Sequence, residues 1–341
     1  MGIQDEVMLS EIELERSLLA SGVGASATSG DNEAVPVIDM SLPEDQVAEE
    51  MWKASNEVGF FTVINHGIPQ EEVDSVFDVS KTFFSTLDQE EKEEQSPFER
   101  SQNSGYEYMA QVRPATGTAD QKESLQITAR QACMDGRWPS TPSQFKTTTK
   151  SMMEKAHELA CKIVSLLEAK ACPHLEPGTL AKAHTLWNHD GQCTLRLLHY
   201  PPIDETSIDE LMKPGNVHWR AGPHTDWDCV TLLFQRMGEA GLECRANPRA
   251  TTTTEASWIP VAPVEGGIAV NIGDMLMRWS DRNLFSNLHR VRMPQNVDEC
   301  SRSRYSVAFF LQADKSAIIE SQTNDTITAG DFILARIKSN Y

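Results

Sequence analysis

Several features that mark common classes of protein are missing from this sequence. No stretch approaches the ~20 consecutive apolar residues that a membrane-spanning helix requires. Basic residues are in the minority, with 30 Lys and Arg against 50 Asp and Glu, so the formal net charge is −20. A chain this acidic is a poor partner for the phosphates of a nucleic acid or for an anionic membrane surface. We therefore expect neither a nucleic acid nor a membrane as a partner.

The seven cysteines show no pairing pattern. Their number is odd and no two of them are separated by exactly two residues, so neither a disulfide framework nor a zinc ribbon is predicted. The first residues, MGIQDEVMLS, lack the basic and apolar regions of a secretory signal. Reduced thiols and the lack of a signal favour a cytoplasmic protein.

What is present is a long chain whose texture changes along its length. With 341 residues, 40% of them hydrophobic, it is large enough for one large domain or two modest ones. Small polar residues precede the first apolar run, so residues 1–34 are predicted to be a flexible N-terminal segment. Residues 35–145 then alternate between strand-like and helix-like patterns of apolar residues, which predicts an N-terminal α/β region. Its expected strands are 35–40 and 60–67, and its expected helices are 43–59 and 69–86.

The second half of the chain is rich in short runs that favour strands. A long amphipathic helix is expected first, at 146–171. The strands expected after it are 193–202, 230–235, 258–263, 268–274, 287–294 and 304–312. This spacing predicts an antiparallel barrel or sandwich over residues 146–337, sharing one core with 35–145, with a C-terminal tail at 338–341. The polar stretch 236–257 is expected to be a surface loop or hairpin.

A histidine and an aspartate stand two positions apart in GPHTDWDC, just before the strand expected at 230–235. Residues i and i+2 of an extended chain face the same side, so His224 and Asp226 are placed to share a metal ion. His289 begins another expected strand and completes a set of two histidines and one carboxylate, which suits Fe(II) with open positions. Zinc could use the same ligands, and an ordinary polar turn into a strand is the alternative interpretation of the first pair. His174 also lies two positions before a carboxylate, but in a loop bounded by Pro and Gly, which favours a surface role.

A second pair of alternating residues, Arg304 and Ser306, lies in RYSVAFFLQ. A guanidinium beside a hydroxyl can bind a carboxylate through two hydrogen bonds. The apolar run that follows predicts a buried strand, and a buried arginine needs an anionic partner. This strand contains no acidic residue, so an organic acid is a plausible partner, and Tyr200 could add a hydroxyl from a neighbouring strand. A surface arginine on an edge strand is the alternative.

In this order, HTD (224–226), His289 and RYS (304–306) resemble the motifs of the Fe(II)/2-oxoglutarate-dependent dioxygenases. VPVIDM…GFFTVINHGIP (35–69) resembles the N-terminal region of the isopenicillin N synthase-like branch, and GYEY and DQKESLQI resemble its substrate-side segments. The resemblance covers about residues 35–337 and is greatest to fungal small-molecule oxygenases. The chain departs from plant relatives in two places. Leu198 stands where they often have Asn, and the 15 positions from His289 to Arg304 exceed their usual spacing.

The resemblance implies a distorted double-stranded β-helix, or jelly roll, flanked by N-terminal and central helices. The fold class is thus mixed α/β with a mainly antiparallel β core. The implied Fe(II) ligands are His224, Asp226 and His289. The residues implied to bind 2-oxoglutarate are Arg304, Ser306 and Tyr200.

The resemblance also implies an activity. The enzyme would be an oxygenase that hydroxylates, desaturates or oxidatively rearranges a small organic substrate, and it would release succinate and CO2. O2 is the other cosubstrate, ascorbate is expected to help in vitro, and fungal specialised metabolism is the expected context. The residues expected to line the substrate pocket are Tyr106, Gln126, Trp219, Trp227 and Phe310.

Two alternative functions stay open on the sequence. A 2-oxoglutarate-independent Fe(II) oxidase of the isopenicillin N synthase type would keep the fold and the iron but use Arg304 for another carboxylate. A non-catalytic jelly-roll binding protein would have lost its metal, although the presence of all three ligand types argues against it.

Overall fold

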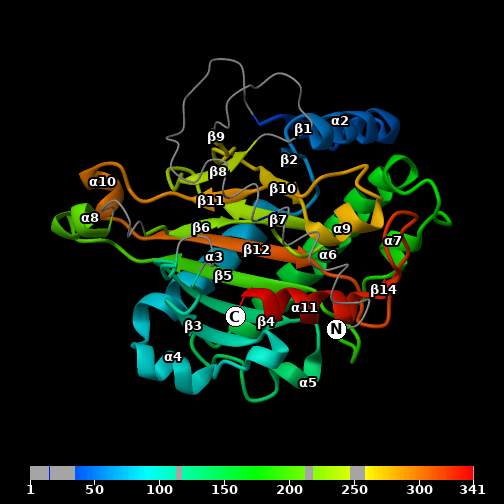
Figure 1. Cartoon of the computed structure of the whole chain (residues 1–341). Helices are drawn as coiled ribbons and strands as arrows, with labels where there is room; N and C mark the ends of the chain where they lie inside the picture. The colour runs from blue at the N-terminus through cyan, green and yellow to red at the C-terminus, as the bar shows by residue number, and fades with distance from the viewer. Residues whose placement is uncertain (1–14, 16–34, 113–116, 212–217, 246–257, 341) are drawn as a thin grey trace.

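The computed structural model describes residue 15 and residues 35–112, 117–211, 218–245 and 258–340, and its elements form three layers (Figure 1). A layer of helices packs on one face of an eight-stranded sheet, and a four-stranded sheet packs on the other. One apolar cluster joins the helices to the large sheet. A second cluster lies between the two sheets and includes Phe60, Leu198 and Ala308 from the large sheet and Leu242 and Val291 from the small one.

The large sheet has the strand order β1-β2-β10-β7-β12-β5-β4-β3. β1 and β2 pair in parallel, and every other pair of neighbouring strands in this order is antiparallel. The strands are β1 (Val37–Asp39), β2 (Phe60–Ile64), β3 (Gly105–Tyr108), β4 (Glu123–Thr128), β5 (Thr194–Tyr200), β7 (Val230–Gln235), β10 (Ile268–Ile272) and β12 (Arg304–Leu311). The predicted mixed α/β fold with a mainly antiparallel core is therefore confirmed.

The small sheet has the order β6-β11-β8-β9. Its strands are β6 (Ala221–His224), β8 (Leu242–Arg245), β9 (Trp258–Pro260) and β11 (His289–Val291). Two alternatives were expected for 236–257, a surface loop or a hairpin. β8 contradicts the surface loop, because it is a mostly buried strand that pairs with β11 and, in antiparallel fashion, with the next strand, β9. Residues 246–257 lie outside the described part of the chain. A short β13 (Ile318–Ile319) and β14 (Ile327–Thr328) pair separately.

Three helices cover the outer face of the large sheet: α2 (Glu44–Glu57), α3 (Gln70–Thr86) and α6 (Phe145–Ala171). Their amphipathic sequences place apolar residues against the sheet, as the periodicity predicts. The shorter helices are α4 (Gln89–Gln95), η1 (Arg100–Gln102), α5 (Gln131–Met134), α7 (Thr179–Lys182), α8 (Glu205–Leu211), α9 (Asp274–Trp279) and α10 (Val297–Cys300). Among the described residues, no helix is long and apolar enough to cross a membrane.

The last helix, α11 (Ala329–Asn340), was not expected from the sequence. The predicted tail boundary at 337 falls inside it. Two of its residues, Ile333 and Ile337, line the same pocket as residues of both sheets, so α11 closes one side of the space between the sheets. The predicted flexible segment 1–34 lies outside the described residues, except for Glu15.

Candidate metal and cosubstrate site

A pocket opens between the two sheets, and its wall is set by strand alternation. In β12, Tyr305, Val307 and Phe309 are in the core on the helix side. The residues that alternate with them, including Arg304, Ser306 and Phe310, line the pocket instead. The period of two in a strand therefore divides one sequence, RYSVAFFL, between a core and a site.

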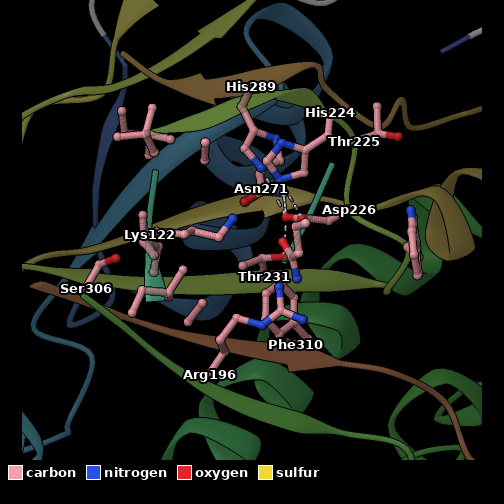
Figure 2. Close-up of a pocket in the computed structure, with 18 of the residues that line it drawn as sticks. Lys122, Arg196, His224, Thr225, Asp226, Thr231, Asn271, His289, Ser306 and Phe310 are labelled. Carbon is pink, nitrogen blue, oxygen red and sulfur yellow. Dashed lines mark hydrogen bonds and ion pairs between the residues drawn. The ribbon is translucent and has the colours of Figure 1, made fainter. Parts of the chain in front are cut away.

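Three predicted metal ligands meet at the upper end of this pocket (Figure 2). His224 ends β6 and His289 begins β11, and the two residues are direct partners in the antiparallel register. One ligand atom from each of them and one from Asp226 lie within 4.8 Å of one another. The Nε2 atoms of His224 and His289 are 3.8 Å and 3.6 Å from the carboxylate oxygens of Asp226. Bonds of about 2.2 Å to one shared ion could span such separations.

The backbone fixes which ring nitrogen each histidine presents. Nδ1 of His224 lies 2.7 Å from the carbonyl of Gly222, and Nδ1 of His289 lies 3.1 Å from the carbonyl of Asn287. A carbonyl can only accept, so the proton of each neutral ring sits on Nδ1 and the lone pair on Nε2. Both Nε2 atoms are therefore in the state that binds a metal.

The third ligand is oriented by side chains of the large sheet. Oδ2 of Asp226 accepts hydrogen bonds from Asn271 Nδ2 at 2.9 Å and from Thr231 Oγ1 at 2.7 Å. Thr231 Oγ1 is also 2.9 Å from Oδ2 of Asp228. Burial and the nearby charge of Asp226 raise the pKa of Asp228 well above its ordinary value. A neutral Asp228 can donate to Thr231, which leaves the single Thr231 proton for Asp226.

An ion pair behind the ligands holds the connecting loop to α11. The Asp226 carbonyl accepts from the backbone N–H of Asp274, and the Asp274 carboxylate accepts from the Thr225 hydroxyl at 3.1 Å. Arg336, which is fully buried, brings a guanidinium nitrogen within 2.7 Å of the same carboxylate. The C-terminal helix is thus fastened to the residue between two metal ligands.

The predicted carboxylate-binding residues gather at another end of the pocket. Arg304 and Tyr200 are direct partners across β12 and β5, and the guanidinium carbon lies 4.8 Å from the centre of the tyrosine ring. Arg304 donates to the carbonyl of Glu239 at 3.0 Å, to Gln235 at 3.3 Å and to Ser306 at 3.3 Å. Among the described residues, Arg304 has no acidic partner within ion-pair distance. Its charge is therefore available to an organic anion.

Arg220 adds a second positive charge that the sequence analysis missed. Its guanidinium carbon lies 5.9 Å from the centre of the Tyr200 ring, and the side chain is buried. Burial, together with the neighbouring Arg304, lowers the pKa of Arg220 to about 10. The region around Tyr200 is thus strongly cationic, which favours an anion there.

The five predicted substrate-pocket residues divide into two groups. Trp227 and Phe310 line the pocket. Tyr106 does not, because its hydroxyl bonds to Glu123 and its ring packs with Phe83 among the helices.

Gln126 and Trp219 are also placed outside the pocket lining. The amide of Gln126 donates to Glu107, and the Trp219 ring stacks on Arg290, whose guanidinium carbon lies 4.5 Å from the ring centre. Both side chains are buried against protein rather than open to the cavity.

Arg196 is the pocket residue that sequence reasoning should have found. It stands four positions before Tyr200 on β5, so strand alternation puts both on one face. Figure 2 shows its guanidinium over the Phe310 ring, below Asp226 and Thr231. Lys122, Ile333 and Ile337 also line the pocket, but their neighbouring sequence carries no comparable signal.

Two family models match the chain. The model described as the N-terminal part of a non-haem dioxygenase in morphine synthesis covers residues 35–146. The model described as the 2OG-Fe(II) oxygenase superfamily covers residues 191–313 and contains all three candidate metal ligands, Arg304 and Ser306.

Individual relatives agree with these matches. The chain is 30% identical over 311 residues to the 2-oxoglutarate-dependent dioxygenase tropC of Talaromyces stipitatus, covering 83% of this chain and 87% of the relative. It is 28% identical over 346 residues to the 2-oxoglutarate-Fe(II) type oxidoreductase hxnY of Emericella nidulans, covering 90% of each.

The solved structure of a full-length Neurospora crassa protein in complex with alpha-KG and thymine matches with a TM-score of 0.77 and 25% sequence identity. The match covers 93% of this chain and 100% of that one. This similarity confirms the predicted double-stranded β-helix. It also extends the agreement from separate motifs to nearly the whole chain. The chain therefore belongs to the 2OG-Fe(II) oxygenase superfamily, and it is an oxidoreductase that uses Fe(II), 2-oxoglutarate and O2.

Proposed function

We propose that His224, Asp226 and His289 hold the Fe(II) of this oxygenase. The observation that carries the proposal is the convergence of these three side chains at one point, with both histidines presenting Nε2. Two imidazoles and one carboxylate suit Fe(II) and leave coordination positions for small ligands. When bound, the iron supplies O2 activation coupled to decarboxylation of 2-oxoglutarate to succinate and CO2.

Arg304, Ser306 and Tyr200 are assigned to the carboxylate of 2-oxoglutarate that is remote from the metal. Among the described residues, no carboxylate lies within ion-pair distance of Arg304, which supports this role because a buried guanidinium needs an anion. Its bonds to Glu239, Gln235 and Ser306 fix the orientation of the guanidinium before the anion arrives. Arg220 increases the attraction by placing a second cation beside Tyr200.

The remaining pocket wall excludes water and orients the substrate. Trp227, Phe310, Ile333 and Ile337 give it an aromatic and aliphatic surface. We infer a small organic substrate that is hydroxylated, desaturated or oxidatively rearranged in the cytoplasm, within specialised metabolism. The curated relatives, including the oxidoreductases and dioxygenases of fungi, support such a role.

The experiment that tests this proposal uses the unmutated protein. It is incubated in air with Fe(II), ascorbate, 2-oxoglutarate and a panel of aromatic and amphipathic metabolites, and succinate and product mass are measured. We expect one succinate for each substrate molecule oxidised. Product formed at full rate without 2-oxoglutarate would instead indicate an oxidase of the isopenicillin N synthase type.

A further inference from the structure

The substrate end of the pocket contains a cation for which the function proposed above has no use. Arg196 lines the pocket, and its guanidinium carbon lies 5.2 Å from the centre of the Phe310 ring. Its Nε is buried and has no hydrogen-bond partner. Within the described ranges, no carboxylate pairs with this side chain.

The other pocket cations near the site have partners. Lys122 lies 2.6 Å from the Asp120 carboxylate, and Arg304 is hydrogen-bonded as described above. On the strand that flanks Arg196, its direct partner Gln126 is already bonded to Glu107. An arginine inside a pocket without a compensating group is costly unless a ligand supplies the missing charge.

The anion that meets Arg196 differs from the 2-oxoglutarate carboxylate assigned to Arg304. The register pairs Arg304 with Tyr200 and Ala308 with Arg196, so the two arginines are attached four residues apart along the same pair of strands. At about 3.3 Å per residue, their attachment points are roughly 13 Å apart. Arg196 therefore serves a second ligand, bound at the other end of the pocket.

The surroundings of Arg196 also limit the shape of that ligand. The guanidinium lies against the face of Phe310, and Trp227, Ile333 and Ile337 line the same pocket. A flat guanidinium backed by an aromatic ring presents its N–H groups in one plane, which matches a carboxylate in two hydrogen bonds. The aromatic and aliphatic wall favours a ring attached to that carboxylate.

We propose that Arg196, supported by Phe310, is a specificity-determining residue that binds the carboxylate of a planar aromatic or heteroaromatic acid. This inference rests on the proposed function, because it assigns the substrate class of the same oxygenase site. It makes the substrate an anion, so the pocket binds two carboxylic acids, one at each arginine.

Calorimetric titration under anaerobic conditions tests the proposal on protein loaded with Fe(II) and 2-oxoglutarate. The probes are benzoate and 1-naphthoate, each with its neutral primary amide. We expect at least one acid to bind about tenfold or more tightly than its amide. In Arg196→Gln, binding of that acid should weaken about 10- to 100-fold while binding of the amide changes little, since one charged hydrogen-bonding partner is lost. Arg196→Lys, which keeps the charge, should give intermediate affinity.

Arg302→Gln is the matched control, because it removes the same charge from an exposed residue outside the pocket lining. It should leave the preference for acids unchanged. Equal binding of acids and amides by the unmutated protein, no binding of any probe, or an unchanged preference in Arg196→Gln would each overturn the proposal. Iron and 2-oxoglutarate binding are measured in the same samples. If the unmutated protein fails to bind iron or 2-oxoglutarate, the proposed function is refuted instead. If Arg196→Gln still binds both, its metal and cosubstrate site is intact.

Discussion

At the scale of single residues, the two histidine ligands offer a direct comparison with a third histidine. His224→Ala and His289→Ala each remove one of three protein ligands. Losing a residue that only orients a ligand lowers metal affinity by about 10- to 100-fold, so losing a ligand itself should lower iron affinity by at least roughly 100-fold. His174→Ala is the control, because its Nδ1 lies 3.8 Å from Asp281 and the residue is not part of the ligand cluster.

Iron content after anaerobic reconstitution, with circular dichroism as the check on folding, measures this effect. Both ligand variants should be folded and nearly free of iron, while His174→Ala should bind as much iron as the unmutated protein. A folded His224→Ala or His289→Ala with full iron content would remove that residue from the site.

Some site residues could be predicted from the sequence because their spacing is local. Arg304 and Ser306 alternate on β12, whereas Asp226 lies two residues after His224 in the loop that follows β6, and both members of each pair lie at the pocket. Tyr106 shows the limit of this reasoning. Its side depends on the pairing of Gly105 with Gln126, which turns Tyr106 toward the helices, and no local pattern encodes that register.

At the scale of elements, α11 is expected to stabilise the site through Arg336. Replacing Arg336 with Met would leave the buried Asp274 carboxylate without this cation, and the cost of breaking a buried pair is about 3–5 kcal/mol. The loop that carries His224, Thr225 and Asp226 should loosen as well, because Asp274 bonds to it.

Urea unfolding and iron titration of Arg336→Met check this prediction. Lys338→Ala is the control on the same helix, since Lys338 is exposed. We expect a lower free energy of unfolding and weaker iron binding only in Arg336→Met. If both variants match the unmutated protein, α11 does not support the site.

The elements that could be predicted are those with strong periodicity, such as α6 and the apolar strands β7 and β12. β8 was not predicted as a separate strand, because its four residues, LECR, include two charged side chains. The burial of Glu243 is explained only by the partner strand, where Arg290 Nε lies 2.7 Å from its carboxylate, and Arg245 is only partly buried. Because Arg290 lies 47 residues from Glu243 along the chain, the sequence around β8 gives no local indication of this pairing.

At the scale of the whole molecule, charge and topology act over long distances. The net charge of −20 opposes the approach of anions such as 2-oxoglutarate, so the arginines within the pocket must supply the local attraction. The strand order, with β5 between β12 and β4, brings Arg196, Tyr200 and Arg304 to one cavity. β5 and β12 were predicted as strands from the sequence, whereas β4 and the strand order were not, because strand pairing between distant segments leaves no local pattern.

The central claim is that this oxygenase binds 2-oxoglutarate through Arg304, and one assay tests it most directly. Succinate formation is measured as 2-oxoglutarate is titrated into the unmutated protein, Arg304→Lys and Arg304→Ala. Truncating one side of a buried charged pair costs about 3–5 kcal/mol, so the KM for 2-oxoglutarate should rise by about two to three orders of magnitude in Arg304→Ala. Arg304→Lys should lie between, and iron content should stay unchanged in both variants. An unchanged KM in Arg304→Ala, or turnover of the unmutated protein without 2-oxoglutarate and without succinate, would contradict the account.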